Sequence, residues 1–201
     1  MKRNFIYAIL FLILAFQSCG HTKVNPEAAL NNFLHQPTQE NFDLWKMATG
    51  LFETCPMLDS LQSSRYLQLF KLVENGHELA FRTGLLLSRC FDGGELRDFL
   101  SSGGLFFDQN AILFIQTTKR LSVSFLQIEA MLLMLPLHTV DNPEKQISVL
   151  ENRIRKLKAL PEKEFGVATT RLAKSLQKNK ESIETNATEM ENSKSAIPKS
   201  K

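Results

Sequence analysis

Three cysteines and four histidines are the side chains of this 201-residue chain best suited to metal binding or nucleophilic chemistry. Their spacing contains no Cys-x-x-Cys and no His-Glu-x-x-His, the patterns that hold zinc. Glu74 and His77 have the Glu-x-x-His spacing of half a di-iron site, but such a site needs a second pair, and the sequence has none. Gly76 also interrupts the helix on which the pair would lie. We therefore expect no metal and no other cofactor.

Glu129 is the best candidate for acid–base chemistry, because it lies in residues 122–135, the most apolar of the helices that the sequence predicts. A buried carboxylate needs a compensating partner. Glu129 could act as the general acid of a cell-wall hydrolase. It could instead be an exposed edge residue, or form a salt bridge with Arg82, Arg89 or Arg120. The sequence favours either of these over the hydrolase, and we assign no catalytic residue.

Residues 1–19 carry the features of an export signal. Lys2 and Arg3 give a positive start, an apolar run follows from Phe5 to Phe16, and the small residue Ser18 precedes Cys19. The run has twelve residues. As a helix it would rise about 18 Å, well short of a hydrocarbon core about 30 Å thick. It therefore suits a signal peptide better than a transmembrane helix.

The four residues Phe16-Gln17-Ser18-Cys19 resemble the cleavage site of a bacterial lipoprotein. Ser18 and Cys19 match the pattern, while Phe16 and Gln17 differ from the usual Leu and small residue. The resemblance covers only this signal and implies cleavage before Cys19, with a diacylglycerol on its thiol. In such lipoproteins of Gram-negative bacteria, an Asp directly after the cysteine favours retention in the inner membrane. This chain has Gly20 at that position, so the resemblance implies the outer membrane, facing the periplasm. Ordinary secretion and an uncleaved anchor remain the alternatives.

The mature chain is almost neutral. Of the 24 basic residues, Lys2 and Arg3 belong to the signal, which leaves 22 against 21 acidic residues, a formal charge of +1. The sequence pI of about 8.8 is therefore not the footprint of a nucleic-acid-binding protein, and we expect no nucleic-acid partner.

Cys55 and Cys90 form an even pair once Cys19 carries the lipid. They could form a disulfide in an oxidising compartment, or they could be two free, buried thiols. Cys55 and Cys90 end the second and fourth predicted helices, which lie at the same end of an array whose helices alternate in direction. This geometry makes pairing reasonable.

Composition divides the chain into four parts. Leucine is more frequent than valine or isoleucine, a composition that favours helices over sheets. We expect a signal peptide at 1–18, a lipidated tether at 19–25 and a helical domain at 26–177. The segment 178–201 is rich in Lys, Glu, Ser and Asn and has no aromatic residue. It predicts a disordered tail or a frayed extension of the last helix.

Helical periodicity and breaking residues predict an all-α fold of about seven to nine helices. Tight turns favour an antiparallel bundle or a short array of α-hairpins similar to HEAT or tetratricopeptide repeats, although no sequence period is present. Gly93-Gly94 and Gly103-Gly104 are predicted as helix-ending turns, residues 122–135 as a helix buried on several sides, and 105–107 as core in preference to an exposed docking patch. The predicted helices are 26–36, 38–55, 60–75, 77–90, 96–100, 108–119, 122–135, 143–160 and 162–176.

The leading functional interpretation is a lipid-anchored periplasmic binding or scaffold protein without catalytic activity. Its partners would be the membrane, through the lipid, and an unidentified protein or peptide. The scaffold role is an analogy from the fold class. The alternatives are an immunity or inhibitor lipoprotein that neutralises a toxin or hydrolase, and the cell-wall hydrolase using Glu129.

Overall fold

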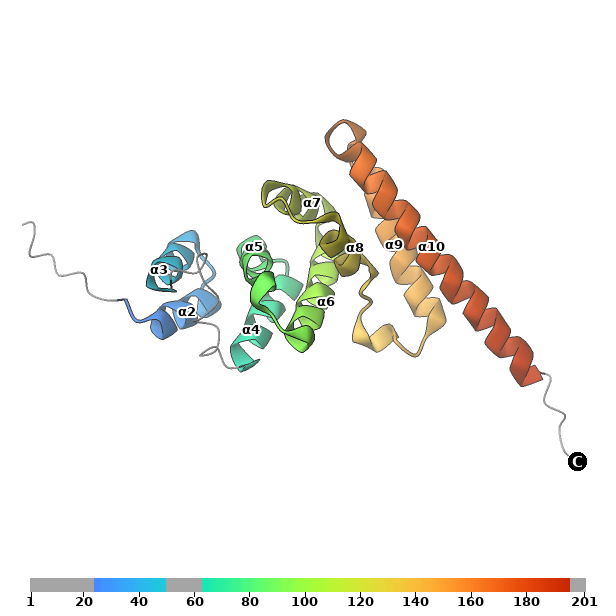
Figure 1. Ribbon diagram of the computed structural model, residues 1–201, viewed down its shortest axis with the longest axis horizontal. Coiled ribbons are helices and arrows are strands. Elements are labelled where there is room, and N and C mark those ends of the chain that lie inside the picture. Colours follow the sequence, from blue (N-terminus) through green and yellow to red (C-terminus); the bar gives the residue numbers. More distant parts are fainter. Residues whose placement is uncertain (1–23, 50–62, 196–201) are drawn as a thin grey trace, which may run out of the picture.

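A computed structural model describes residues 24–49 and 63–195, and these residues contain helices and no strand (Figure 1). The all-α prediction is confirmed, and the nine α-helices of the described ranges fall within the predicted number. The helices are α2 (Pro26–His35), α3 (Gln39–Thr49), α4 (Ser63–Glu74), α5 (Glu78–Leu87), α6 (Gly93–Gln109), α7 (Ala111–Arg120), α8 (Phe125–Leu133), α9 (Pro143–Ala159) and α10 (Glu162–Ser195). Short 3₁₀ turns follow α5, at Ser88–Cys90, and α8, at Leu137–Thr139.

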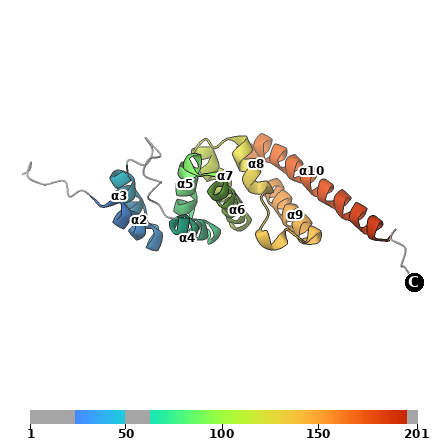
Figure 2. The same ribbon diagram turned by 60° about the horizontal axis from the view of Figure 1, so that its bottom comes forward.

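The helices form an elongated array of stacked hairpins rather than a bundle around one centre. Successive helices pair as α2–α3, α4–α5, α6–α7 and α9–α10, with α8 between the last two pairs (Figures 1 and 2). One row of contacts runs through α2, α4, α6 and α8, and α5 packs on α7 beside it. Each hairpin therefore packs mainly on its neighbours in the sequence.

Aromatic side chains make up much of the core. Phe81 of α5 stacks on Phe106 of α6, with ring centroids 4.4 Å apart, and lies 5.2 Å from the ring of Phe114 in α7. At the N-terminal hairpin, Phe33 stacks on Trp45 at 5.6 Å. Burial of such large rings is a main source of stability, so the aromatic contacts hold neighbouring hairpins together.

Side-chain caps explain where several helices begin. Asn25 accepts hydrogen bonds from the first turn of α2, Thr38 from that of α3, and Asn142 from that of α9. Gly76 has a φ of +83°, a conformation that glycine adopts without strain, and it turns the chain between α4 and α5. These starts and this turn are the ones that the sequence predicts.

The glycine pairs were predicted wrongly as helix-ending turns. Gly93 and Gly94 open α6 after the cap Asp92, and Gly103 and Gly104 lie in the middle of the same helix. A Cβ atom on Gly104 would lie 2.6 Å from the backbone oxygen of Met131 in α8. The second pair therefore allows α8 to approach α6 closely, and the predicted short helix 96–100 is part of a longer one.

The segment after the second glycine pair belongs to the core. Phe106 and Phe107 are both 0% exposed, and Leu105 is partly buried. The prediction of core rather than an exposed docking patch is confirmed for the two phenylalanines.

Helix α8 is shorter and more exposed than predicted. It begins at Phe125 because Ser122 has a φ of 52° and Ser124 caps the helix. Met131 and Leu132 are its buried residues, whereas Leu126 is 72% exposed. Apolar composition alone did not show that one side of this helix faces solvent.

Helix α10 continues far into the polar C-terminal segment. The chain is helical from Glu162 to Ser195, so residues 178–195 extend the helix and do not form the disordered tail. Ile183 packs partly buried against the core, and Lys180 donates a hydrogen bond to Glu151 of α9 at 2.7 Å. Residues 196–201 lie outside the described ranges. None of the described helices is both long enough and apolar enough to cross a membrane.

Candidate functional site

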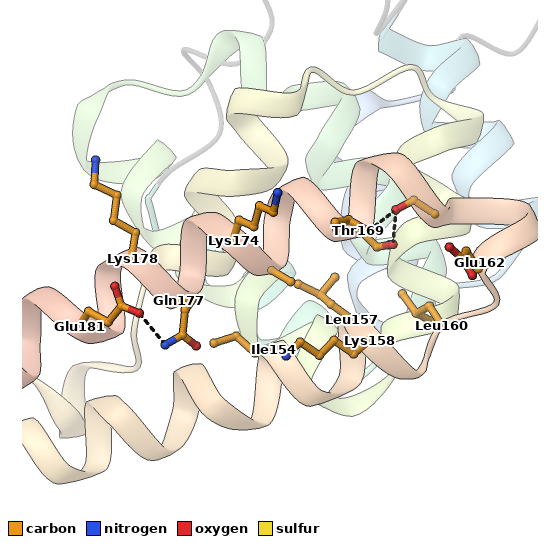
Figure 3. A pocket seen from close by; sticks show the side chains of 13 residues that line it. Ile154, Leu157, Lys158, Leu160, Glu162, Thr169, Lys174, Gln177, Lys178 and Glu181 are labelled. Carbon is orange, nitrogen blue, oxygen red and sulfur yellow. Dashed lines mark hydrogen bonds between the residues drawn. The ribbon is translucent and has the colours of Figure 1, made fainter.

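The α9–α10 hairpin carries an open groove along one side (Figure 3). Leu150, Ile154 and Leu157 recur at helical spacing in α9 and are buried against α10 and the rest of the core. On α10 the large residues Leu172 and Leu176 are also buried, and small side chains face the groove. The hollow left between the helices has a volume of about 580 Å³.

The floor of the groove is apolar. Ile154 and Leu160 remain 7% and 8% exposed, and Ala173 closes the floor from the side of α10. Thr169 lies beside them, and its hydroxyl group donates to the backbone carbonyls of Phe165 and Gly166 in the same helix, at 3.1 Å and 3.2 Å. The hydroxyl donor of Thr169 is therefore already used within α10, and the floor presents apolar surface.

Lysines dominate the rim of the groove. Lys158, Lys174 and Lys178 are exposed, and within the described residues they have no ion-pair partner. Glu162 and Glu181 also line the groove, and Glu181 accepts a hydrogen bond from Gln177 at 2.9 Å. The rim therefore carries three positive and two negative side chains.

Ion pairs at Lys180 fix α10 against the middle of α9. Its Nζ lies 2.7 Å from Glu151 and 3.3 Å from Glu184. The hydrogen bond to Glu151 raises the pKa of Lys180 above its usual range, and partial burial opposes this shift. Lys180 therefore remains charged at physiological pH and holds α10 against α9.

A neighbouring hollow of about 550 Å³ lies between α7, α8 and the start of α10. Glu162 and Gly166 line both hollows, so the two meet at the first turns of α10. Val167, which is 89% exposed, and Phe125 add apolar surface there. The guanidinium carbon of Arg171 lies 4.0 Å from the centre of the Phe125 ring. Apolar surface thus continues around this end of the hairpin.

A buried arginine fixes the position of α9 and with it the groove. Arg153 is 0% exposed and forms a two-pronged ion pair with Asp108 of α6, the shortest contact being 2.7 Å. Its Nη1 also donates to the carbonyls of Leu132 and Met134, at 2.8 Å and 2.9 Å. One side chain thus ties α9 to α6 and to the end of α8.

The sequence analysis did not single out Arg153. The available signal was its position, three residues after Leu150 and four before Leu157, on the buried face of the helix. The groove was also missed, because it depends on which face of α10 the small residues occupy.

Glu129 does not form the arginine pair considered from the sequence. It is partly buried on α8, and within the described ranges its side chain has no hydrogen bond or ion pair, so Arg82, Arg89 and Arg120 are not its partners. It does not line the α9–α10 groove.

Glu74 and His77 lie at the end of α4 and directly before α5. Glu74 accepts a hydrogen bond from Ser102 at 2.9 Å, and His77 precedes α5 as its N-cap residue. Across residues 24–49 and 63–195, no three His, Cys, Asp or Glu side chains are grouped to hold a metal ion. In this position Glu74 joins α4 to α6.

Of the three cysteines, only Cys90 lies in the described part of the chain. It ends the 3₁₀ turn after α5 and is disulfide-bonded. Cys55 and the predicted lipidation site Cys19 lie outside the described residues. The pairing of Cys90 with Cys55 and the lipid on Cys19 therefore stay predictions.

Comparison of the chain with known protein families, with curated proteins and with solved structures finds no match.

Proposed function

We propose that this chain is a lipid-anchored binding protein of the bacterial envelope, without catalytic activity, that holds a helix of a partner protein in the α9–α10 groove. The observation that carries the proposal is the apolar floor of an open groove between two long helices. Grooves of this kind take the apolar face of an amphipathic helix. The volume of about 580 Å³ lies within the usual range for binding pockets.

The rim supports a protein partner rather than a small molecule. Three lysines that have no ion-pair partner in the described part of the chain lie beside an apolar floor. They suit a helix whose apolar face is flanked by acidic residues. Rim charges of this kind mainly set the orientation and rate of docking, while the apolar floor supplies affinity. The large apolar side chains of the partner would fill the hollow above Ile154, Leu160 and Ala173.

The anchor follows from the resemblance around Cys19. Two or three acyl chains contribute about 0.8 kcal/mol per buried CH₂, which is sufficient for stable attachment. In this proposal the protein faces the periplasm from the outer membrane, with residues 19–25 as its tether. A Cys19→Ala variant would lose incorporation of labelled palmitate and leave the membrane fraction. Retention of the label in that variant would disprove lipidation at Cys19.

The inhibitor alternative lacks the observation that would favour it. An acidic groove, complementary to a basic toxin or hydrolase, would support that role. The α9–α10 groove instead carries more lysine than glutamate on its rim, so we do not put the inhibitor forward.

Site-specific photo-crosslinking tests the groove in native cells. A benzoylphenylalanine at Thr170, inside the groove, is expected to give a discrete crosslinked product in the membrane fraction. The matched control places the same residue at Ser148, which is exposed on α9 and does not line the groove. Ala173→Trp, which fills the groove, should remove the product. A product of equal intensity from both positions, or one that survives Ala173→Trp, would show that the groove is not the binding site.

A further inference from the structure

A further hollow, of about 430 Å³, lies away from the α9–α10 groove, on the side of the array formed by α3, α5 and α7. Three of its lining side chains are cations, one from each of these helices. The other three are apolar. The six residues are Lys46, Arg82 and Arg120, with Phe42, Leu86 and Leu121. We call the space that these six residues line the α3–α5–α7 hollow.

Contacts between neighbouring hairpins hold two of the cations in place. Arg82 of α5 lies over the ring of Phe42 in α3, with 5.1 Å between its guanidinium carbon and the ring centre. Its Nη1 donates to the side-chain oxygen of Gln39 at 3.4 Å. Arg120 of α7 donates to Glu78 of α5 at 2.8 Å. A ligand would meet these groups already ordered, which lowers the entropy lost on binding.

Both guanidinium groups keep hydrogen-bond donors to spare. An arginine has five N–H donors in a fixed fork, and each of the hydrogen bonds above uses one nitrogen. Arg120 is 55% exposed and Glu78 41%, so this ion pair faces solvent and can open to a competing carboxylate. The remaining donors of Arg82 and Arg120 can therefore contact an anionic group.

The cations and the apolar side chains that line the hollow together indicate the kind of ligand it can bind. The six lining residues include three cations and no carboxylate, and the adjacent Glu78 offsets one of the positive charges. Arginine forks bind carboxylates in two-pronged geometry. Phe42, Leu86 and Leu121 provide apolar wall beside the cations. The hollow therefore suits a carboxylate with an apolar group next to it.

We propose that the α3–α5–α7 hollow binds an acidic peptide segment of a protein partner. A carboxylate of the segment contacts Arg82 and Arg120, and an adjacent apolar side chain packs on Leu86 and Leu121. This site is separate from the helix-binding groove, and its existence does not depend on the occupant of that groove.

The test uses the purified full-length protein and a fluorescent ten-residue peptide of alternating Glu and Leu. We expect this peptide to bind about tenfold more tightly than its Gln–Leu counterpart, the size of effect typical of one charge-assisted hydrogen bond. Fluorescence anisotropy measures both affinities at low and at high salt. Affinity for the Glu–Leu peptide should fall at high salt, because the contact is between charges near the surface.

Substitutions then locate the binding. Arg120→Gln and Arg82→Gln should each weaken binding of the Glu–Leu peptide about fivefold to tenfold. Arg97→Gln, on the exposed side of α6, is the control for general charge and should leave binding unchanged. Lys174→Gln, on the rim of the α9–α10 groove, should also have no effect. Circular dichroism of each variant would show that the fold is intact.

Three outcomes would overturn the proposal. Equal affinity for the Glu–Leu and Gln–Leu peptides would mean that no carboxylate is recognised. Binding that responds to Lys174→Gln and not to Arg120→Gln would place the peptide in the α9–α10 groove. Competition by soluble short-chain phosphatidylglycerol at lower concentrations than the unlabelled peptide would identify a lipid headgroup as the preferred ligand.

Discussion

Arg153 shows how one buried side chain determines the packing of several helices. Its three nitrogens are all used, by the Asp108 carboxylate and by the carbonyls of Leu132 and Met134. Buried charge is tolerated only where it is paired in this way. Gly104 leaves the space that the guanidinium occupies, because a Cβ there would lie 2.8 Å from Nη2.

Arg153→Met is therefore expected to destabilise the protein by about 3–5 kcal/mol, since it leaves the Asp108 carboxylate and two carbonyls without their donor. Chemical denaturation followed by circular dichroism measures this loss. Arg155→Met is the control, because Arg155 is exposed on the same helix and should change stability by less than about 0.5 kcal/mol. Similar stabilities for the two variants would contradict the structural role of Arg153.

Two glycines of α6 should respond oppositely to alanine. Gly104→Ala is expected to cost about 1–3 kcal/mol, because its methyl group would press on Met131 and Arg153. Gly93→Ala, in the first turn of the same helix, has no atom within 4 Å of the added carbon and should be neutral or stabilising by up to about 1 kcal/mol. Thermal unfolding distinguishes the two. A neutral Gly104→Ala would mean that α6 and α8 can move apart easily.

For single residues, the sequence shows the chemical type of each side chain but not which side chains it contacts in the fold. Arg153 and Asp108 lie 45 positions apart, and neither has a local pattern that indicates its partner. Gly103-Gly104 reads as a turn because glycine is permissive in the same way in a turn and at a close helix contact. Only the position of α8 distinguishes the two cases.

Among the elements, α10 differs most from its partner in length. It has 34 residues and would span about 51 Å, whereas the 17 residues of α9 span about 26 Å. Lys180 and Ile183 join α10 to Glu151 of α9 and to the core. The C-terminal end of α10 projects beyond α9 (Figure 1).

Truncation of α10 is thus expected to affect stability in two stages. A chain that ends at Glu189 keeps the contacts of Lys180 and Ile183 and should unfold within about 1 °C of the full-length protein. A chain that ends at Gln177 also loses the Lys180–Glu151 pair and Ile183, and should unfold about 2–4 °C lower. Differential scanning calorimetry measures both. An equal effect of the two truncations would show that α10 is not held through Lys180 and Ile183.

The positions of most helices could be predicted because their signals are local. Asn25 and Asn142 precede prolines at helix starts, and Gly76 marks a turn, so short stretches of sequence contain the necessary information. The exposure of Leu126 and the extension of α10 could not be predicted in this way. They depend on which neighbours a helix meets, and composition does not specify these.

For the whole molecule, the disulfide of Cys90 links the central helices to another part of the chain. With Cys55 as the predicted partner, full-length protein that is unfolded without reductant should show no reactive thiol other than Cys19 where it is not lipidated. Reduction should then lower stability by about 3–4 kcal/mol, since the bridge closes a loop of about 35 residues. Ellman titration counts the thiols, and denaturation in dithiothreitol measures the loss. A free Cys55 would refute the pairing.

The stacking of hairpins on their sequence neighbours has a consequence for how the chain acquires its structure. Among the described residues, side-chain hydrogen bonds between helices join positions at most 48 apart, as between Lys156 and Asp108. Contacts of this kind give a low contact order, which is associated with fast folding. An N-terminal hairpin finds its partners soon after it leaves a ribosome or a translocation pore, without waiting for the C-terminal residues. Assembly can therefore advance along the chain in the order of its synthesis.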